Sequence, residues 1–217
     1  MVTVAEMQSQ NEHAALVRKV LHWVGLVAPM DVDLPDELTD GSGELIAVPT
    51  GWTSIGLVTP DGLTFGRDTE KDDIPALGHA SPVRSDITGV ERSVSFTSLE
   101  YGRKELLEIW FGQSLDGIEP DEGGEVVIDE VDLPIGLERR LLFIGGDGSG
   151  DDSWVLGRAF PRVKLADAGE QQWQQEGAIE QEFTFDVFTD DELGFPVRHY
   201  IGGPGAVKHA DALGFAA

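Results

Sequence analysis

Residues 180–188 show a clear alternation of polar and apolar side chains, from Glu182 to Val187, and this alternation predicts a β-strand with one buried and one exposed face. The apolar positions are Phe183, Phe185 and Val187. The opposite face is acidic and carries Glu180, Glu182 and Asp186. A pattern of period two favours a β-structure in which this strand lies over an apolar core.

Shorter strand patterns separated by turn residues recur along the chain. We expect strands at residues 45–48, 53–58, 90–97, 126–128, 139–144, 154–163 and 198–201. Only residues 98–111 have the spacing of an amphipathic helix packed on a sheet, and Gly112 follows where a C-terminal cap belongs. The sequence therefore predicts a mainly β fold, a sandwich or barrel, with one flanking α-helix.

The two ends of the chain differ from this central region. Residues 5–24 carry apolar side chains at helical spacing, and residues 30–44 are acidic, without a basic residue, and rich in Pro and Gly. We expect residues 1–44 to form an N-terminal arm with a short helix and an acidic loop. The β domain is expected at 45–205, and residues 206–217 are expected to form a C-terminal arm.

Net charge limits the functions that the chain can have. The sequence has 15 Lys and Arg against 40 Asp and Glu, a formal charge of −25. Proteins that neutralise DNA or bind anionic membranes need clustered cations, so this balance argues against both classes. There is no Cys, which excludes a disulfide framework and a cysteine nucleophile. No apolar run approaches the roughly 20 residues of a membrane span.

The sequence shows no catalytic or metal-binding constellation. Residues 145–152 are rich in Gly and Asp, but they lack the Lys-Ser/Thr ending of a phosphate loop. Read as a calcium loop, the same segment has Asp152 where Gly is needed and Arg158 where the bidentate Glu belongs. The five His residues are scattered and make no zinc spacing. We therefore expect a protein that is not an enzyme and that needs no cofactor or metal, and we expect a hairpin tip at 145–152.

The order of these features resembles one protein family. The segment GWTSIGLVTPDGLTF at 51–65 resembles the strand, turn and strand segment of siphophage major tail proteins. Similar features follow: an acidic stretch at 67–74, the strand at 90–97, and a helix that ends on Ile-Trp-Phe-Gly at 109–112. Phe-Pro-Arg-Val at 160–163 and the alternating strand at 180–188 complete a resemblance that covers roughly residues 48–200.

The resemblance implies a tail-tube β-sandwich whose inner sheets join around a six-membered ring. Rings of this kind stack into the hollow tube that phage DNA passes through. The expected place of the protein is the virion tail, after assembly in the host cytoplasm. The expected partners are further copies of the chain, the tape measure protein, the tail terminator and the tail-tip proteins, with DNA passing through unbound. Glu180, Glu182 and Asp186 are candidate residues of the lumen, because an acidic wall would not retain DNA.

Segments too long to serve a monomer are candidate contacts between subunits or rings. They are the expected loop at 61–84, with Asp61, Arg67 and Arg84, and the two arms. Trp173, in a polar stretch, is a further candidate. Two alternatives stay open. One is another ring-forming tail component, such as a terminator, or a tube protein of a secretion or gene-transfer particle. The other is a binding or hydrolytic β-sandwich from a salt-adapted organism.

Overall fold

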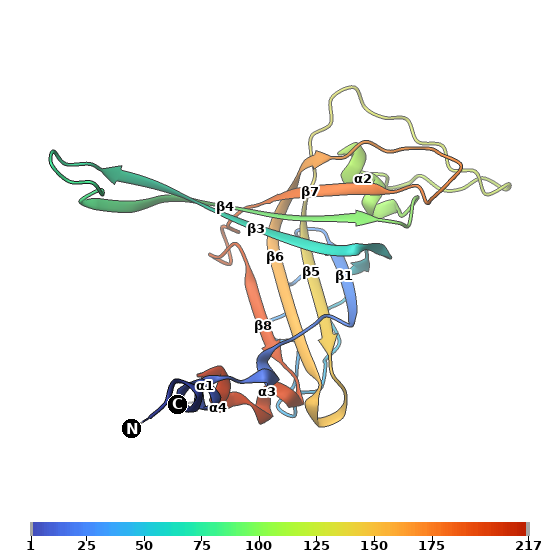
Figure 1. Cartoon of the computed structure of the whole chain (residues 1–217). Coiled ribbons are helices and arrows are strands. Elements are labelled where there is room, and N and C mark those ends of the chain that lie inside the picture. The colour runs from blue at the N-terminus through green and yellow to red at the C-terminus, as the bar shows by residue number, and fades with distance from the viewer. Residues whose placement is uncertain (1, 216–217) are drawn as a thin grey trace.

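The chain folds around one eight-stranded antiparallel sheet, seen in a computed structural model that describes residues 2–215 (Figure 1). The strands are β1 (His22–Ala28), β2 (Thr53–Ser54), β3 (Val58–Ile74), β4 (Arg84–Ser98), β5 (Glu138–Asp147), β6 (Trp154–Ala168), β7 (Gln181–Val187) and β8 (Arg198–Gly202). The helices are α1 (Val4–Asn11), α2 (Lys104–Phe111), α3 (Pro204–Lys208) and α4 (Ala210–Leu213), with 3₁₀ turns η1 (Ala14–Leu16) and η2 (Gly150–Asp152). The mainly β expectation is confirmed.

Strand β6 joins two halves of the sheet. The order is β2-β1-β5-β6-β7-β4-β3, and β8 also pairs with β6. The first part of β6 pairs with β5 and β8, and its last part pairs with β7. Strands β3, β4 and β7 consequently run across β1, β5, β6 and β8 in Figure 1. We call these the crossing half and the upright half of the sheet.

Aromatic side chains fill the space where the two halves face each other. Phe183 and Phe185 of β7 are almost completely buried, and they stack with Phe96 of β4. Phe143 of β5 meets Phe96 edge-on, with ring centroids 6.1 Å apart. This burial is why the strand predicted from alternation forms, because its apolar face lies in the core and its polar face does not.

The upright half is covered on its other face as well. Leu142 and Ile144 of β5 point away from the aromatic core and pack with Leu34 and Leu38. The acidic segment expected as an open loop therefore also contributes to the fold, through the apolar residues between its carboxylates. Tyr200 of β8 holds this segment by donating a hydrogen bond to the Pro35 carbonyl at 2.6 Å.

Helix α2 is shorter than expected. It begins at Lys104 instead of residue 98, because Gly102 has a φ of 95° and Arg103 is extended, and neither conformation is helical. Its end is as predicted, since Gly112 adopts the left-handed conformation with a φ of 61°. Glu108 on its buried side accepts a hydrogen bond from the Leu115 N–H, which connects the helix to the segment that follows.

The expected long loop at 61–84 is instead a β-hairpin. Strands β3 and β4 pair almost to its tip, the last pair being Ile74 with Arg84, and only residues 75–83 are unpaired. The distal part of the hairpin projects far from the rest of the sheet (Figure 1). Pro60-Asp61-Gly62, the turn residues of the segment 51–65, form an irregularity within β3, where the register shifts between Val58 and Leu63.

Three further local expectations are wrong. Residues 45–48 form no strand, and the only pairing there is a single bridge between Thr39 and Leu45. Residues 126–128 also form no strand, because no strand of the described sheet lies beside them to pair with. Strand β1 begins at His22, inside the range 1–44 that was expected to lie outside the β domain. It pairs with β5 along its whole length.

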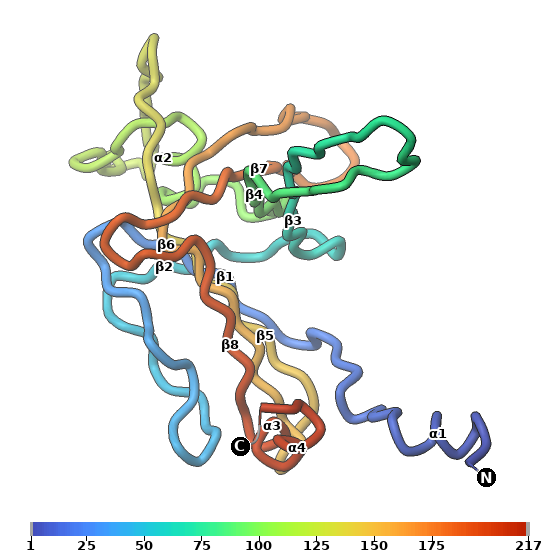
Figure 2. Tube along the Cα trace, turned by 90° about the vertical axis from the view of Figure 1, so that its left-hand side faces the viewer, coloured from blue at the N-terminus to red at the C-terminus, as the bar shows by residue number. Residues whose placement is uncertain are grey.

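The two arms are folded differently. The N-terminal arm leads away from the body, and α1 at its end has a capping box between Thr3 and Glu6 (Figure 2). The described part of the C-terminal segment is α3 and α4, which lie by the β5–β6 tip (Figure 2). There Lys208 pairs with Asp152 at 2.6 Å, and the His209 ring stacks on Trp154. The last residues of the expected C-terminal arm, 216–217, lie outside the described residues.

Candidate functional site

The outer face of the crossing half is polar and carries two of the three predicted acidic residues. Glu182 and Asp186 of β7 are exposed on it, and Glu180 is exposed just before the strand. Their cross-strand neighbours on β4 are Thr97, opposite Glu182, and Ser93, opposite Asp186. Small hydroxyl groups beside carboxylates make this surface smooth and anionic.

One cation interrupts this face. Lys164 of β6 lies opposite Asp186 on one side and opposite Glu138 on the other. It belongs to the few basic residues that make no ion pair within residues 2–215. Glu138 is also in an ion pair with Arg162 at 2.8 Å, so the unpaired lysine of this row lies beside one unpaired carboxylate, that of Asp186.

The same face continues onto the β3–β4 hairpin, where it becomes strongly acidic. The register places five carboxylates on it: Asp68, Glu70, Asp72, Asp86 and Glu91. Arg84, near the tip, is its one cation and contacts Asp86 at 2.6 Å. We call this surface the acidic face of the hairpin.

The opposite face of the hairpin is basic. It carries Arg67, Lys71 and Arg92, with Asp73 as its one carboxylate. None of the three cations makes an ion pair within residues 2–215. Nine of the 15 basic residues of the chain do make ion pairs, so half of the remaining six gather on this basic face.

Like charges face each other directly across the hairpin. Arg67 is paired with Arg92, Asp68 with Glu91, and Asp72 with Asp86. Like charges in directly opposed positions destabilise a strand pair. A hairpin whose register opposes like charges is better suited to contact another molecule than to stand alone.

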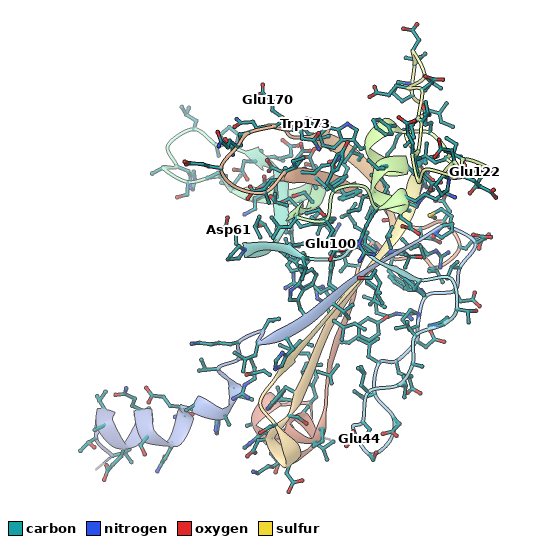
Figure 3. All side chains as sticks on the ribbon, turned by 90° about the vertical axis from the view of Figure 1, so that its right-hand side faces the viewer. Glu44, Asp61, Glu100, Glu122, Glu170 and Trp173 are labelled. Atoms are coloured by element: carbon teal, nitrogen blue, oxygen red, sulfur yellow. The ribbon has the colours of Figure 1, made fainter. Side chains whose placement is uncertain are left out.

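The four predicted contact residues do not form one site. Arg67 and Arg84 lie on the hairpin, on opposite faces, and Asp61 lies at the irregularity in β3. Trp173 is in the separate loop 169–180 above the sheet, as Figure 3 shows. It is 74% exposed and meets Tyr101 edge-on, with ring centroids 6.1 Å apart.

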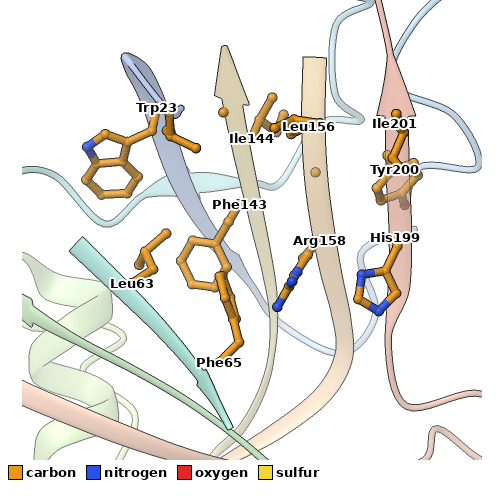
Figure 4. Close-up of a pocket in the computed structure, with 13 residues that line it drawn as sticks. Trp23, Leu63, Phe65, Phe143, Ile144, Leu156, Arg158, His199, Tyr200 and Ile201 are labelled. Carbon is orange, nitrogen blue, oxygen red and sulfur yellow. The ribbon is translucent and has the colours of Figure 1, made fainter. Parts of the chain in front are cut away.

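An apolar pocket of about 330 Å³ lies between β3 and the upright half (Figure 4). Trp23, Leu63 and Phe143 form part of its wall, and Arg158, His199 and Tyr200 are its titratable groups. The Arg158 guanidinium lies over the Phe65 ring, 4.2 Å from its centroid. Burial lowers the pKa of Arg158, and burial followed by the charge of Arg158 lowers the pKa of His199. The pocket brings a hydrophobic surface and one cation together, and it holds no nucleophile with a base.

The Gly/Asp segment at 145–152 is the tip of the β5–β6 hairpin, as predicted. Asp152 holds Lys208 of α3 there, and the hydrogen bond from Lys208 keeps the pKa of Asp152 below its ordinary value. Within residues 2–215 no group of three or more His, Asp or Glu side chains is arranged to hold a metal ion. No described helix is long and apolar enough to cross a membrane.

Residues 21–201 match the family model for phage tail tube proteins. The chain belongs to the phage tail tube protein family. The match spans the whole sheet, from β1 into β8, and the resemblance noted from the sequence is thereby confirmed. A tail tube protein is a structural component of the virion tail.

Solved tail structures are similar to this tail tube protein at low identity. The SPP1 tail tube is 10% identical, with 88% of this chain and 82% of that chain covered and a TM-score of 0.36. A chain from the virion of a native gene transfer agent is 10% identical, with 75% and 98% covered and a TM-score of 0.37. A chain from the sheath–tube complex of an extracellular contractile injection system is 7% identical, with 94% and 99% covered and a TM-score of 0.38. No curated protein matches the sequence. The family assignment rests on the family model.

Sequence reasoning missed Arg92, Lys71 and the carboxylates of the hairpin. A single sequence shows which residues are charged, but the opposition of like charges appears only once the register of β3 against β4 is known. Long stretches with charges at both even and odd positions were the available signal for a hairpin exposed on both faces.

Proposed function

We propose that this tail tube protein assembles into rings, expected to have six subunits, that stack into the hollow conduit for phage DNA. The observation that carries the proposal is the pair of open edges on the crossing half. Strand β3 pairs only with β4, so the whole of its other edge is unpaired within residues 2–215. Unpaired edges of this length are templates for pairing with another chain.

The second open edge lies at the far side of the same half. The pairing of β5 with β6 ends at Lys164, whereas β6 continues to Ala168 and pairs there only with β7. The edge of β3 in one copy and the end of β6 in the next are therefore both free to meet. Such a contact joins two different surfaces and closes into a ring when the rotation between copies is right.

Joined in this way, the crossing halves form a continuous wall with the polar outer face on one side. We assign that face to the lumen, with Glu180, Glu182 and Asp186 on it. A conduit must release the DNA that it carries, and every cation on its wall would add affinity for phosphate. Six copies carry a formal charge of 6 × −25 = −150, so counter-ions have to screen the assembled ring.

Charge reversal tests the lumen assignment. The variant Glu180→Lys, Glu182→Lys, Asp186→Lys is expected to form tubes, because these side chains lie outside the core, and to slow DNA ejection from particles. A control with the same change in charge reverses Asp31, Glu37 and Glu44, exposed in the segment against the upright half. Slowed ejection in the first variant alone supports the lumen assignment, and normal ejection refutes it.

The remaining partners follow from the same proposal. A tube needs a tape measure protein to set its length, a tip to begin it and a terminator to end it. We propose these proteins as partners, and we propose assembly in the host cytoplasm before the tail joins the virion.

A further inference from the structure

We infer that the β3–β4 hairpin of one copy docks into the groove between α2 and the loop 112–137 of a neighbouring copy, with its basic face on the carboxylates of that loop. The inference deepens the proposed function and rests on it, since it names the two surfaces that join successive subunits. The charges and the exposed apolar side chains of both surfaces carry it.

The first surface is the hairpin, which is unpartnered on both faces. Its basic face offers Arg67, Lys71 and Arg92 without an ion pair within residues 2–215. Its tip adds exposed apolar side chains, with Leu77 fully exposed and Val83 half exposed. Four large apolar residues are exposed near the tip of the hairpin, and such a cluster is expected to be buried by a partner in an assembled protein. They are Ile74, Leu77, Val83 and Ile87.

The second surface combines the opposite charge with the same apolar character. The loop 112–137 has eight carboxylates and no basic residue between residues 116 and 132. Only Asp116 is in an ion pair within residues 2–215, with Lys104 at 2.6 Å. The loop also exposes large apolar side chains, which are Ile118, Val126, Val127, Val131, Leu133 and Ile135.

A groove of about 210 Å³ separates this loop from α2. Leu107 forms its helix side, and Leu115, Ile118 and Val126 form its loop side. Lys104 at its margin is the one cation, and the hydrogen bond from Lys104 to Asp116 raises the pKa of that lysine. An apolar groove with free carboxylates around it matches an apolar tip with free cations beside it.

The positions of the two surfaces suit a head-to-tail contact. The hairpin leaves the body at one side, and α2 with its loop lies at the opposite side and at a similar level (Figure 1). Copies placed one after another in the same orientation therefore bring the hairpin of one to the groove of the next. Repeated contacts between different surfaces propagate along an assembly, as a ring or a stack requires.

Charge complementarity also explains the register of the hairpin. Placing Arg67 opposite Arg92 destabilises the isolated hairpin but concentrates positive charge on one of its faces. An acidic partner offsets that repulsion when the copies meet. The acidic face then stays in solvent, continuous with the outer face of the crossing half.

Cysteine cross-linking tests the contact directly, because the chain has no Cys of its own. Tubes assembled from a mixture of Leu77→Cys and Val127→Cys subunits are oxidised and run on a non-reducing gel. The inference predicts disulfide-linked dimers in the mixture and none in tubes of either variant alone. As a control, Leu77→Cys is mixed with Leu57→Cys, which is exposed on the body of the chain. Dimers only in the control mixture, or in neither mixture, overturn the inference.

Compensating charge reversals provide a second test. Reversing Arg67, Lys71 and Arg92 to Glu should raise the critical concentration for assembly by at least about 100-fold, because like charges then meet. Adding Glu122→Lys, Glu125→Lys and Glu130→Lys should restore assembly. The matched control adds Asp31→Lys, Glu37→Lys and Glu44→Lys instead, which gives the same net charge at the wrong place.

The two tests separate failure of this inference from failure of the proposed function. Absence of rings and tubes from the wild-type chain counts against the proposed function. Wild-type tubes with no effect of the hairpin reversal, or with equal rescue by both acidic segments, overturn the docking inference and leave the proposed function standing. Circular dichroism of each dispersed variant confirms that the sheet is folded.

Discussion

Replacing Arg67 by Glu should have opposite effects on the isolated hairpin and on assembly. In the wild-type chain Arg67 lies directly opposite Arg92, and neither side chain has an ion pair within residues 2–215. The variant turns a repulsive cross-strand pair into an attractive one. The hairpin of the dispersed subunit becomes more stable, while the face proposed to meet an acidic neighbour loses positive charge.

The register sets the size of the local effect. A cross-strand charge pair contributes roughly 0.2–1 kcal/mol, and the change removes one repulsion and adds one attraction. The expected gain is therefore about 0.4–2 kcal/mol in the free energy of opening the hairpin, which slows amide hydrogen exchange by about 2- to 30-fold. Both residues are near the surface, so the gain should shrink as salt is added.

Hydrogen exchange of the hairpin amides, measured by mass spectrometry below the concentration of tube formation, provides the assay. The matched control is Arg84→Glu, which has the same change in charge but lies opposite Ile74 and loses its contact with Asp86. We expect slower exchange for Arg67→Glu and faster exchange for Arg84→Glu. Unchanged or faster exchange in Arg67→Glu would refute the argument from opposed like charges.

Three further variants or conditions test the fold around these surfaces. Phe183→Ala removes a fully buried ring of the aromatic core and should lower the free energy of unfolding by about 3–5 kcal/mol, measured by denaturant titration. Glu108→Ala leaves the largely buried Arg139, 2.9 Å from the carboxylate in the wild-type chain, without its partner and should cost about 3–5 kcal/mol; Glu108→Gln has one acceptor oxygen, keeps one of the two hydrogen bonds that the carboxylate accepts and should cost less, and equal losses would contradict this reading of the pair. The pKa of Asp152 is lowered, mainly by the hydrogen bond from Lys208, so the contact with α3 should be complete above the ordinary value of 3.8 and weaken as pH falls through the lower folded-state value. NMR signals of residues 204–213 would follow this change, and release of α3 already at neutral pH would contradict it.

The sequence predicted elements in which one face packs on the core. Strand β7 was found because Phe183 and Phe185 are buried while Glu182 and Asp186 are exposed, which produces a period of two. The end of α2 was found because Gly112 is needed at a left-handed position. At these positions the local sequence pattern directly reflects which residues are buried or which backbone conformation is required.

The hairpin and β1 could not be recognised in the same way. Both faces of the distal hairpin are exposed, so charges occupy even and odd positions and no alternation remains. Residues 5–24 have apolar side chains at helical spacing, but residues 22–24 belong to β1, and the pairing of β1 with β5 overrides that spacing there. The bend in β6 that folds the sheet onto itself also depends on partners far away in the chain.

The sequence predicted the acidic character of the candidate site but not the positions of its residues relative to one another. Alternation correctly predicted that Glu182 and Asp186 are exposed on β7, whereas the role of that acidic surface in repelling DNA stays a prediction. The division of the hairpin into a basic and an acidic face needed the register, including the shift between Glu70 and Lys71. The groove beside α2 needed the path of the loop 112–137, which has no regular structure to predict.

The most direct test of the central claim is negative-stain electron microscopy of the purified, concentrated protein at low and high salt. Assembly through two open edges and a projecting hairpin predicts rings or hollow tubes with a regular axial repeat in at least one of the two salt conditions, because salt screens the repulsion between subunits of charge −25 and also weakens the contact between the basic face of the hairpin and the acidic loop. Dispersed monomers under all of these conditions would contradict it.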